Sequence, residues 1–122
     1  MFFHRNIYEM SGGFDHNYFM YCEESDWQRR VLDFGINSKC INTPKIIHLV
    51  GGSAGDKDSW STFRFLNGNR SQNIYVKKFY SRGTYYLFRI LKKILFIPMI
   101  FFSGRAKSLS DRLDIAKSII KE

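Results

Sequence analysis

The stretch GGSAGDKDS at residues 51–59 divides the chain into two parts of different character. Before it, turn signals alternate with short apolar segments and one helical pattern. After it, apolar side chains recur at helical spacing. The chain has 122 residues, which suits one small domain or a piece of a larger one and excludes a complete large two-domain enzyme. We therefore expect residues 1–58 and residues 59–122 to form separate regions.

The two parts also differ in charge. Residues 1–60 hold 6 of the 19 Lys and Arg residues and 8 of the 11 Asp and Glu residues, so the remainder holds 13 basic and 3 acidic residues. This asymmetry indicates that the second part faces phosphates or an anionic surface. Because 44% of the residues are hydrophobic, the chain is not disordered. Its 2 cysteines are too few for a disulfide scaffold or a zinc ribbon, which favours a reduced, cytosolic setting.

In the first part, one helix and two strands are predicted. Apolar residues at helical spacing mark the helix: Trp27, Val31 and Phe34. Gly35 predicts its C-terminal end, and three acidic residues open its first turn, where the helix dipole favours them. Strands are predicted at Ile36–Ile41 and Ile46–Val50, with a turn at residues 42–44 between them.

In the second part, helices are predicted at 59–80, weakened at 67–69, at 84–97, where Pro98 interrupts the apolar run, and at 109–121. The middle helix has an apolar face of Leu87, Phe88, Leu91, Ile94 and Leu95 and a basic face of Arg89, Lys92 and Lys93. Three cations, each costing about 2.5–3.5 kcal/mol at a bilayer centre, argue against a membrane span. We expect this helix to lie on an anionic membrane surface. The alternative is a helix packed on its own domain with a solvated basic face.

The most specific pattern lies in two segments, GGFDHNYFMYCEESDWQRR at residues 12–30 and KIIHLVGGS at residues 45–53. A Gly-Gly-Phe-Asp turn leads into an aromatic stretch, an acidic cluster that opens a helix, and a basic residue; a His-x-x-Gly segment follows downstream. This order resembles the C-terminal part of bacterial family 2 glycosyltransferases of the GT-A fold. The rhamnosyltransferase-type enzymes of lipopolysaccharide O-antigen and cell-surface polysaccharide synthesis are the most similar. The likeness covers residues 1–55.

The resemblance implies an α/β fold, namely the second, acceptor-side half of a GT-A domain followed by a basic helical region. The N-terminal half of such a domain, which holds the nucleotide pocket and an Asp-x-Asp pair, has no counterpart in this sequence. We therefore expect the chain to be a truncated enzyme, or a piece of a longer reading frame, that is inactive by itself.

The resemblance also assigns roles to the acidic cluster. It places the catalytic base on Glu24, where many family members have Asp, with Asp26 as the reserve candidate. Such a base removes the proton from the acceptor hydroxyl as that hydroxyl attacks the sugar. The residues expected to contact the acceptor are Asp15, Tyr21, Glu23, Trp27 and Arg30. The alternative is that the acids only cap the helix and pair with Arg29 or Arg30.

By the same resemblance, His48 would help an Asp-x-Asp pair to hold Mn²⁺ or Mg²⁺ on the donor diphosphate. The alternative is a histidine packed in the core. Residues 56–58 (Asp-Lys-Asp) also match Asp-x-Asp, but they lie downstream in a polar loop, where Asp58 can cap the next helix. We interpret them as a cap.

Together these features predict a fragment of an inverting glycosyltransferase that acts peripherally on the inner face of the cytoplasmic membrane. Its donor would be a nucleotide-diphospho-sugar, with a sugar such as rhamnose, and its acceptor a polyprenyl-linked saccharide. Arg89, Lys92 and Lys93 would contact phosphate or anionic headgroups. The alternative is a basic nucleic-acid- or membrane-binding module without catalysis, because rings and cations interleave from Phe63 to Arg82. No nucleic-acid-binding motif accompanies them, so no nucleic-acid partner is expected.

Overall fold

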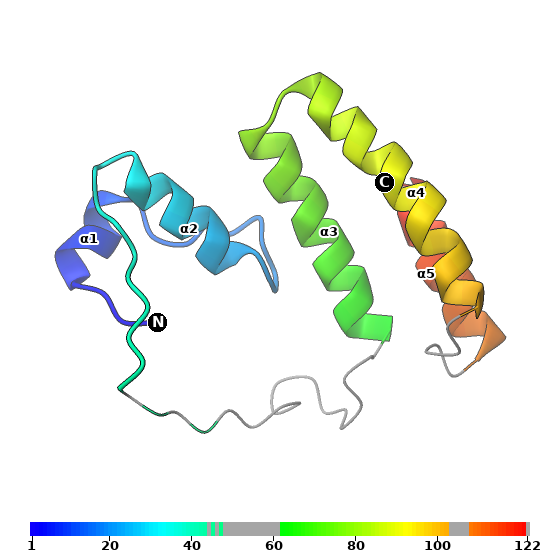
Figure 1. Ribbon diagram of the computed structural model, residues 1–122, viewed down its shortest axis with the longest axis horizontal. Coiled ribbons are helices and arrows are strands. Elements are labelled where there is room, and N and C mark those ends of the chain that lie inside the picture. The colour runs from blue at the N-terminus through cyan, green and yellow to red at the C-terminus, as the bar shows by residue number, and fades with distance from the viewer. Residues whose placement is uncertain (44, 46, 48–61, 103–107, 122) are drawn as a thin grey trace.

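The computed structural model describes residues 1–43, 45, 47, 62–102 and 108–121, and these residues form five helices (Figure 1). In chain order the helices are α1 (Arg5–Met10), α2 (Glu23–Leu32), α3 (Thr62–Phe79), α4 (Arg82–Phe102) and α5 (Leu109–Lys121). Helix α3 lies between α1 and α2 on one side and α4 and α5 on the other (Figure 1). Helix α4 runs back alongside α3 in the opposite direction (Figure 1).

The expected α/β fold is wrong, because the described residues are 68% helical and contain no strand and no sheet. Residues 36–41, expected as a strand, belong to no strand or helix in the described part of the chain. A strand satisfies its backbone N–H and C=O groups only by pairing with a neighbour, whereas a helix pairs these groups within itself. The described residues are therefore not half of a GT-A domain. The second expected strand, at 46–50, lies mostly outside the described residues.

Helix α2 confirms the helix predicted around Trp27. Its first turn carries the three acidic residues and its last turn carries Arg29 and Arg30, so both ends complement the helix dipole. Gly35 ends it as predicted: its φ of 73° is easily adopted by glycine, and its N–H donates to the carbonyl of Leu32 at 2.9 Å. Helix α1 was not predicted; its sequence signal is the Arg5–Glu9 ion pair one turn apart, at 2.9 Å.

The three predicted helices of the second part are confirmed, with different limits. Helix α3 continues through the stretch at 67–69 that was expected to weaken it, and the amide of Asn67 donates to the carbonyl of Phe63 at 2.9 Å. Helix α4 continues through Pro98 to Phe102, since residues on both sides of the proline are packed in a core and packing outweighs local propensity. Helix α5 matches the prediction.

Helices α3, α4 and α5 pack on one another around a small apolar core. Its buried residues are Ile100 of α4 with Ile115 and Ile119 of α5, and three further side chains pack against them: Phe65, Phe96 and Ile97. Ser81 and Ser108 cap α4 and α5, each accepting a hydrogen bond from the backbone N–H three residues later. This core lies near the C-terminal end of α4.

Helix α4 turns a different face inward from the one its apolar pattern predicts. Lys92, expected on a basic outer face, is only 6% exposed, whereas Leu87, Ile94 and Leu95 are more than half exposed. The prediction that the three cations of α4 lie together on the outside is therefore wrong for Lys92. Within the described residues, no helix combines the length and the apolar character that a membrane crossing requires.

Candidate functional site

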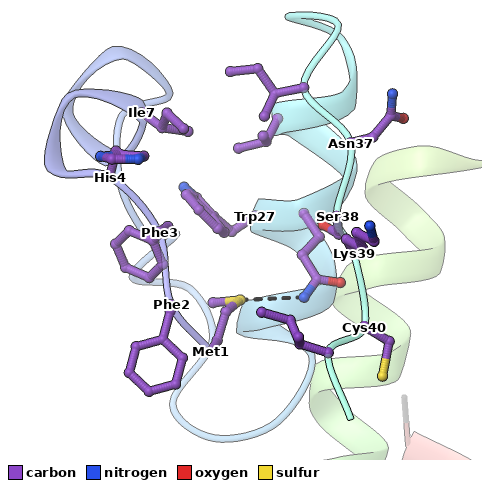
Figure 2. A pocket seen from close by; sticks show the side chains of 14 residues that line it. Met1, Phe2, Phe3, His4, Ile7, Trp27, Asn37, Ser38, Lys39 and Cys40 are labelled. Carbon is purple, nitrogen blue, oxygen red and sulfur yellow. Dashed lines mark hydrogen bonds between the residues drawn. The ribbon is translucent and has the colours of Figure 1, made fainter. Parts of the chain in front are cut away.

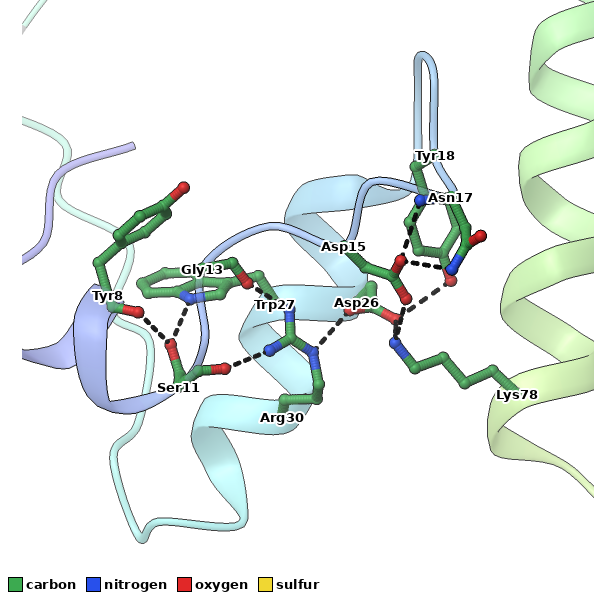
Figure 3. Close-up of polar contacts among 10 residues, drawn as sticks. All are labelled: Tyr8, Ser11, Gly13, Asp15, Asn17, Tyr18, Asp26, Trp27, Arg30 and Lys78. Atoms are coloured by element: carbon green, nitrogen blue, oxygen red, sulfur yellow. Dashed lines mark hydrogen bonds and ion pairs between the residues drawn. The ribbon is translucent and has the colours of Figure 1, made fainter.

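The candidate site is built around the Gly-Gly-Phe-Asp turn that connects α1 to α2. Gly12 and Gly13 both have positive φ, 74° and 68°, and a Cβ on Gly13 would lie 2.8 Å from the ring of Tyr8. The indole N–H of Trp27 donates to the hydroxyl of Ser11 at 2.7 Å, and that hydroxyl donates to the carbonyl of Tyr8 at 3.1 Å (Figure 3). The turn therefore needs glycine at this point and is fixed to α2 by side-chain hydrogen bonds.

Arg30 fastens the same turn from the far end of α2. Its guanidinium donates to the backbone carbonyls of Ser11 and Gly13 and, through Nε, to Asp26 at 2.7 Å (Figure 3). Each of its three nitrogens thus has a partner within the protein. Arg30 was expected to contact the acceptor; in this structure it holds the turn in place.

Asp26 is the centre of the polar network and is fully buried, with 0% of its surface exposed. One carboxylate oxygen accepts from the hydroxyl of Tyr18 at 3.1 Å and pairs with Nζ of Lys78 at 2.6 Å, and the other accepts from Arg30 (Figure 3). The reserve candidate for the base therefore lies inside the protein, with both oxygens occupied by residues from α2, α3 and the connecting loop.

Asp15 belongs to this network from the side of the turn. It pairs with Lys78 at 2.7 Å, and it accepts from the backbone and side-chain amides of Asn17 at 2.9 and 2.8 Å. The hydrogen bond from Lys78, followed by that from the Asn17 backbone, lowers the pKa of Asp15 to about 2. Burial, and then the charge of Asp26, raises the pKa of Tyr18, so its hydroxyl remains a donor.

Glu23 and Glu24 lie in the first turn of α2, outside this network. Glu24 is exposed, whereas Glu23 is half-buried and has one enclosed carboxylate oxygen with no hydrogen-bond partner among the described residues. The preceding residues, Tyr21 and Cys22, have positive φ angles of 69° and 65°, which are uncommon for residues other than glycine. Such strain is frequent at functional sites and persists only where the surroundings hold it.

Packing against α3 holds this strained segment. The hydroxyl of Ser71 donates to the carbonyl of Met20 at 2.6 Å, and the ring of Tyr21 lies beside Gly68, where an added Cβ would be 3.7 Å from it. Burial, and then the charge of Glu23, raises the pKa of the Cys22 thiol. Tyr21 remains partly exposed just before the first turn of α2.

Trp27, also expected to contact the acceptor, is 4% exposed and belongs to an aromatic cluster. Its ring centroid lies 4.6 Å from that of Phe3 and 5.9 Å from that of Phe14. One edge of Trp27 faces a pocket of about 600 Å³ between the N-terminal segment, α2 and residues 36–41 (Figure 2). This pocket was not predicted. In the sequence, the apolar residues Phe2, Phe3 and Ile7 near the N-terminus indicate it.

The predicted metal ligand, His48, lies outside the described residues, as do residues 56–58. Among the residues that are described, no three His, Cys, Asp or Glu side chains come close enough together to hold a metal ion. The proposed role of His48 in holding Mn²⁺ or Mg²⁺ therefore remains a prediction.

The basic residues of α4 are largely engaged within the protein. Nζ of Lys92 donates to the carbonyl of Asn69 at 3.3 Å and to the side-chain oxygen of Asn73 at 3.4 Å, and Nζ of Lys93 donates to the carbonyl of Ile120 at 3.2 Å. The guanidinium of Arg89 lies 5.7 Å from the ring centre of Tyr85. None of the three therefore extends freely into solvent.

Rings and cations that suggested nucleic-acid binding also meet inside the molecule. Arg29 of α2 lies over Phe79 and Tyr80, 4.7 and 5.0 Å from the ring centres. Hydrogen bonds that the Arg29 guanidinium donates to the hydroxyl oxygens of Tyr75 and Tyr80 raise the pKa of Arg29, and Lys78 is paired with two carboxylates. These contacts join α2 to α3 and leave fewer cations for an outside ligand.

No family model matches the chain, and neither a curated protein nor a solved structure matches it.

Proposed function

We propose that this chain provides the acceptor side of an inverting sugar transfer, with Glu24 as the base. The proposal rests on a difference in exposure within the acidic cluster. Asp26 is buried and both its carboxylate oxygens have partners, whereas Glu24 is exposed in the first turn of α2. A second support is the resemblance of residues 12–30 to the acceptor motif of family 2 glycosyltransferases.

In this proposal the carboxylate of Glu24 takes the proton of the acceptor hydroxyl. The hydroxyl oxygen forms a bond to the anomeric carbon of the donor sugar while the bond from that carbon to the diphosphate oxygen breaks, and the nucleoside diphosphate leaves with the electron pair. Tyr21, which is partly exposed and precedes α2 by two residues, offers its ring to the acceptor sugar. The network around Asp26 and Arg30 positions the helix end and does not take part in the proton transfer.

The acceptor is proposed to be a polyprenyl-linked saccharide, and the chain is proposed to act peripherally on the inner face of the cytoplasmic membrane. No described residue is assigned to the nucleotide-diphospho-sugar donor. We therefore expect acceptor binding, but no turnover, from the chain alone.

The test is a titration of the ¹⁵N-labelled chain with a water-soluble saccharide that carries a short prenyl diphosphate. We expect amide shifts concentrated at residues 21–25, a loss of affinity on the order of tenfold in Tyr21→Ala, and unchanged affinity in Glu24→Gln. Phe34→Ala removes a comparably exposed ring at the other end of α2 and is the matched control. Shifts that avoid residues 21–25, or no saturable binding, would contradict the proposal.

The role of Glu24 is tested by turnover. With a donor-binding domain supplied in trans, release of nucleoside diphosphate is expected to fall on the order of 10²-fold or more in Glu24→Gln, because general-base catalysis contributes about that much. Near-normal release in Glu24→Gln, together with loss in a folded Asp26→Asn variant, would move the base to Asp26.

A further inference from the structure

Helix α4 presents an apolar stripe on its outer side that the rest of the described chain leaves largely exposed. Leu87, Leu91 and Ile94 follow one another at helical spacing and are 56%, 47% and 62% exposed, and Leu95 beside them is 62% exposed. A helix of a water-soluble bundle normally buries this kind of stripe. In α4 the buried positions go instead to Lys92 near the middle and to Ile100 near the C-terminal end.

Contacts on the inner side fix this orientation. Lys92 lies over the ring of Phe88, 4.8 Å from its centre, and donates to Asn69 and Asn73 of α3. Lys93 donates to the carbonyl of Ile120 near the end of α5. Rotating α4 to bury its leucines would break these contacts and expose the ammonium groups elsewhere. The apolar stripe therefore points away from the protein as a consequence of the packing.

The charge of this part of the molecule indicates what covers the stripe. Helices α3 and α4 together carry 8 Lys and Arg residues and no Asp or Glu, and the whole chain has a net charge of +8. A second copy meeting the first through α4 would bring together two chains that each carry a net charge of +8, which like-charge repulsion opposes. A surface with anionic headgroups above hydrocarbon satisfies both the charge and the stripe.

The dimensions agree with a helix that lies on such a surface. From Leu87 to Leu95 the stripe is about 12 Å long at 1.5 Å per residue, less than the hydrocarbon thickness of a bilayer of about 30 Å. Tyr85 and Tyr86 lie at its N-terminal end, next to the exposed Arg82, and tyrosine is enriched at the level of the headgroups.

We propose that α4 lies in the headgroup region of an anionic bilayer with Leu87, Leu91, Ile94 and Leu95 inserted toward the acyl chains. The cations of the second part attract the surface from a distance, and the stripe supplies the insertion. This inference does not depend on the proposed sugar transfer, since it uses no residue of the acidic cluster.

The experiment is co-sedimentation of the whole chain with phosphatidylglycerol vesicles at low salt, with a vesicle-free sample as blank. The triple variant Leu87→Ser, Leu91→Ser, Ile94→Ser should bind about a hundredfold more weakly, because each half-exposed side chain contributes about a factor of five on transfer out of water. The matched control replaces Leu32, Phe34 and Ile41 by Ser; these are 50%, 51% and 63% exposed but lie outside α4, and binding should be retained. High salt or phosphatidylcholine vesicles should weaken wild-type binding.

Stability measurements separate this proposal from a packed stripe. The α4 triple variant should keep the thermal unfolding midpoint of the wild type within a few degrees, because the replaced side chains are already exposed. A large drop in the midpoint would show that the stripe is buried in solution and would overturn the proposal. Absence of binding to phosphatidylglycerol at low salt would also overturn it. So would a lipid-free dimer that the triple variant dissociates, since the occupant would then be a second copy.

Discussion

Helices α2 and α4 both have amphipathic sequences, but α2 buries apolar residues of its apolar face whereas α4 leaves most of its apolar face exposed. Helix α2 buries Trp27 and Val31 against the loop before it and pairs its one buried charge, Asp26, with partners at 2.6 and 2.7 Å. Helix α4 buries Lys92 with hydrogen bonds of 3.3 and 3.4 Å and leaves most of its apolar stripe exposed. The comparison teaches that an amphipathic pattern predicts two faces but does not say which one the protein itself will cover.

The two buried charges, Asp26 and Lys92, are held by different contacts. Asp26 receives hydrogen bonds or ion pairs from three side chains, two of them cationic, so its charge is compensated inside the protein. Lys92 donates to oxygens of α3 at 3.3 and 3.4 Å, longer than the contacts of Asp26 at 2.6 and 2.7 Å. Because longer hydrogen bonds are weaker, we expect removal of the charge at Asp26 to destabilise the fold more than removal at Lys92.

The largest effect is predicted for Asp26→Asn. This variant keeps the side-chain shape but leaves Arg30 and Lys78 without their shared carboxylate, and breaking a buried ion pair costs about 3 kcal/mol or more. The measurement is the free energy of unfolding from urea titration followed by circular dichroism. Asp33→Asn, which removes an exposed carboxylate at the end of the same helix, is the control and should change stability by less than about 0.5 kcal/mol. Equal effects at both positions would show that the network is not structural.

A second prediction concerns how rigidly the turn before α2 is held. Gly13→Ala should cost about 2 kcal/mol and Gly12→Ala about 1 kcal/mol, because both need positive φ but only Gly13 has a neighbour in the way, the ring of Tyr8. Urea titration of the two variants measures the difference. If Gly12→Ala proved as costly as Gly13→Ala, contact with Tyr8 would contribute nothing and the backbone angle alone would explain both.

The third prediction concerns Lys92, the buried charge of α4. Lys92→Met keeps the length of the side chain and removes its charge, so the free energy of unfolding should change by about 1 kcal/mol at most. Lys93→Met, whose ammonium contacts only the carbonyl of Ile120 among the contacts described, is the control and should change stability by less than about 0.5 kcal/mol. A loss near that of Asp26→Asn would erase the contrast between α2 and α4.

The smallest effect is predicted for acid titration of Asp15. Its pKa is held at about 2, below the ordinary 3.8, so its ion pair with Lys78 stabilises the fold above about pH 4 and is lost as the pH falls toward 2. The contribution is below about 1 kcal/mol because the pair is partly exposed. Unfolding free energies at about pH 5 and pH 3 should differ less in Asp15→Asn than in the wild type. An unchanged difference would mean that Asp15 does not contribute.

Much of the local structure was predictable from the sequence. The acidic first turn, the spacing of Trp27 and Val31, and Gly35 defined α2, and helical spacing defined α3, α4 and α5, although α4 continues past Pro98. The strand at residues 36–41 was predicted wrongly because such a segment forms a strand only where another strand pairs with it. Local pattern contains no information about the presence of that neighbour.

The candidate site was predicted in part. Sequence spacing brought Asp15, Glu24, Asp26 and Arg30 into one motif, but it could not distinguish the exposed carboxylate from the buried one. That distinction comes from Lys78, which lies 63 residues from Asp15 in the chain and reaches both aspartates from α3. For the same reason, the sequence did not indicate that Trp27 is buried or that Arg30 donates to backbone carbonyls of the turn.

The sequence by itself thus determined where α2, α3, α4 and α5 form and which side chains gather in the turn before α2, because these depend on neighbours within a few residues. Only the tertiary structure decided which face of α4 is covered, which carboxylate of the cluster is buried, and that residues 36–41 have no strand partner among the described residues. Those outcomes depend on contacts between distant segments, such as Lys78 with Asp26 and Lys92 with Asn69. The free energy of such contacts exceeds local conformational preferences, and no short stretch of sequence predicts them.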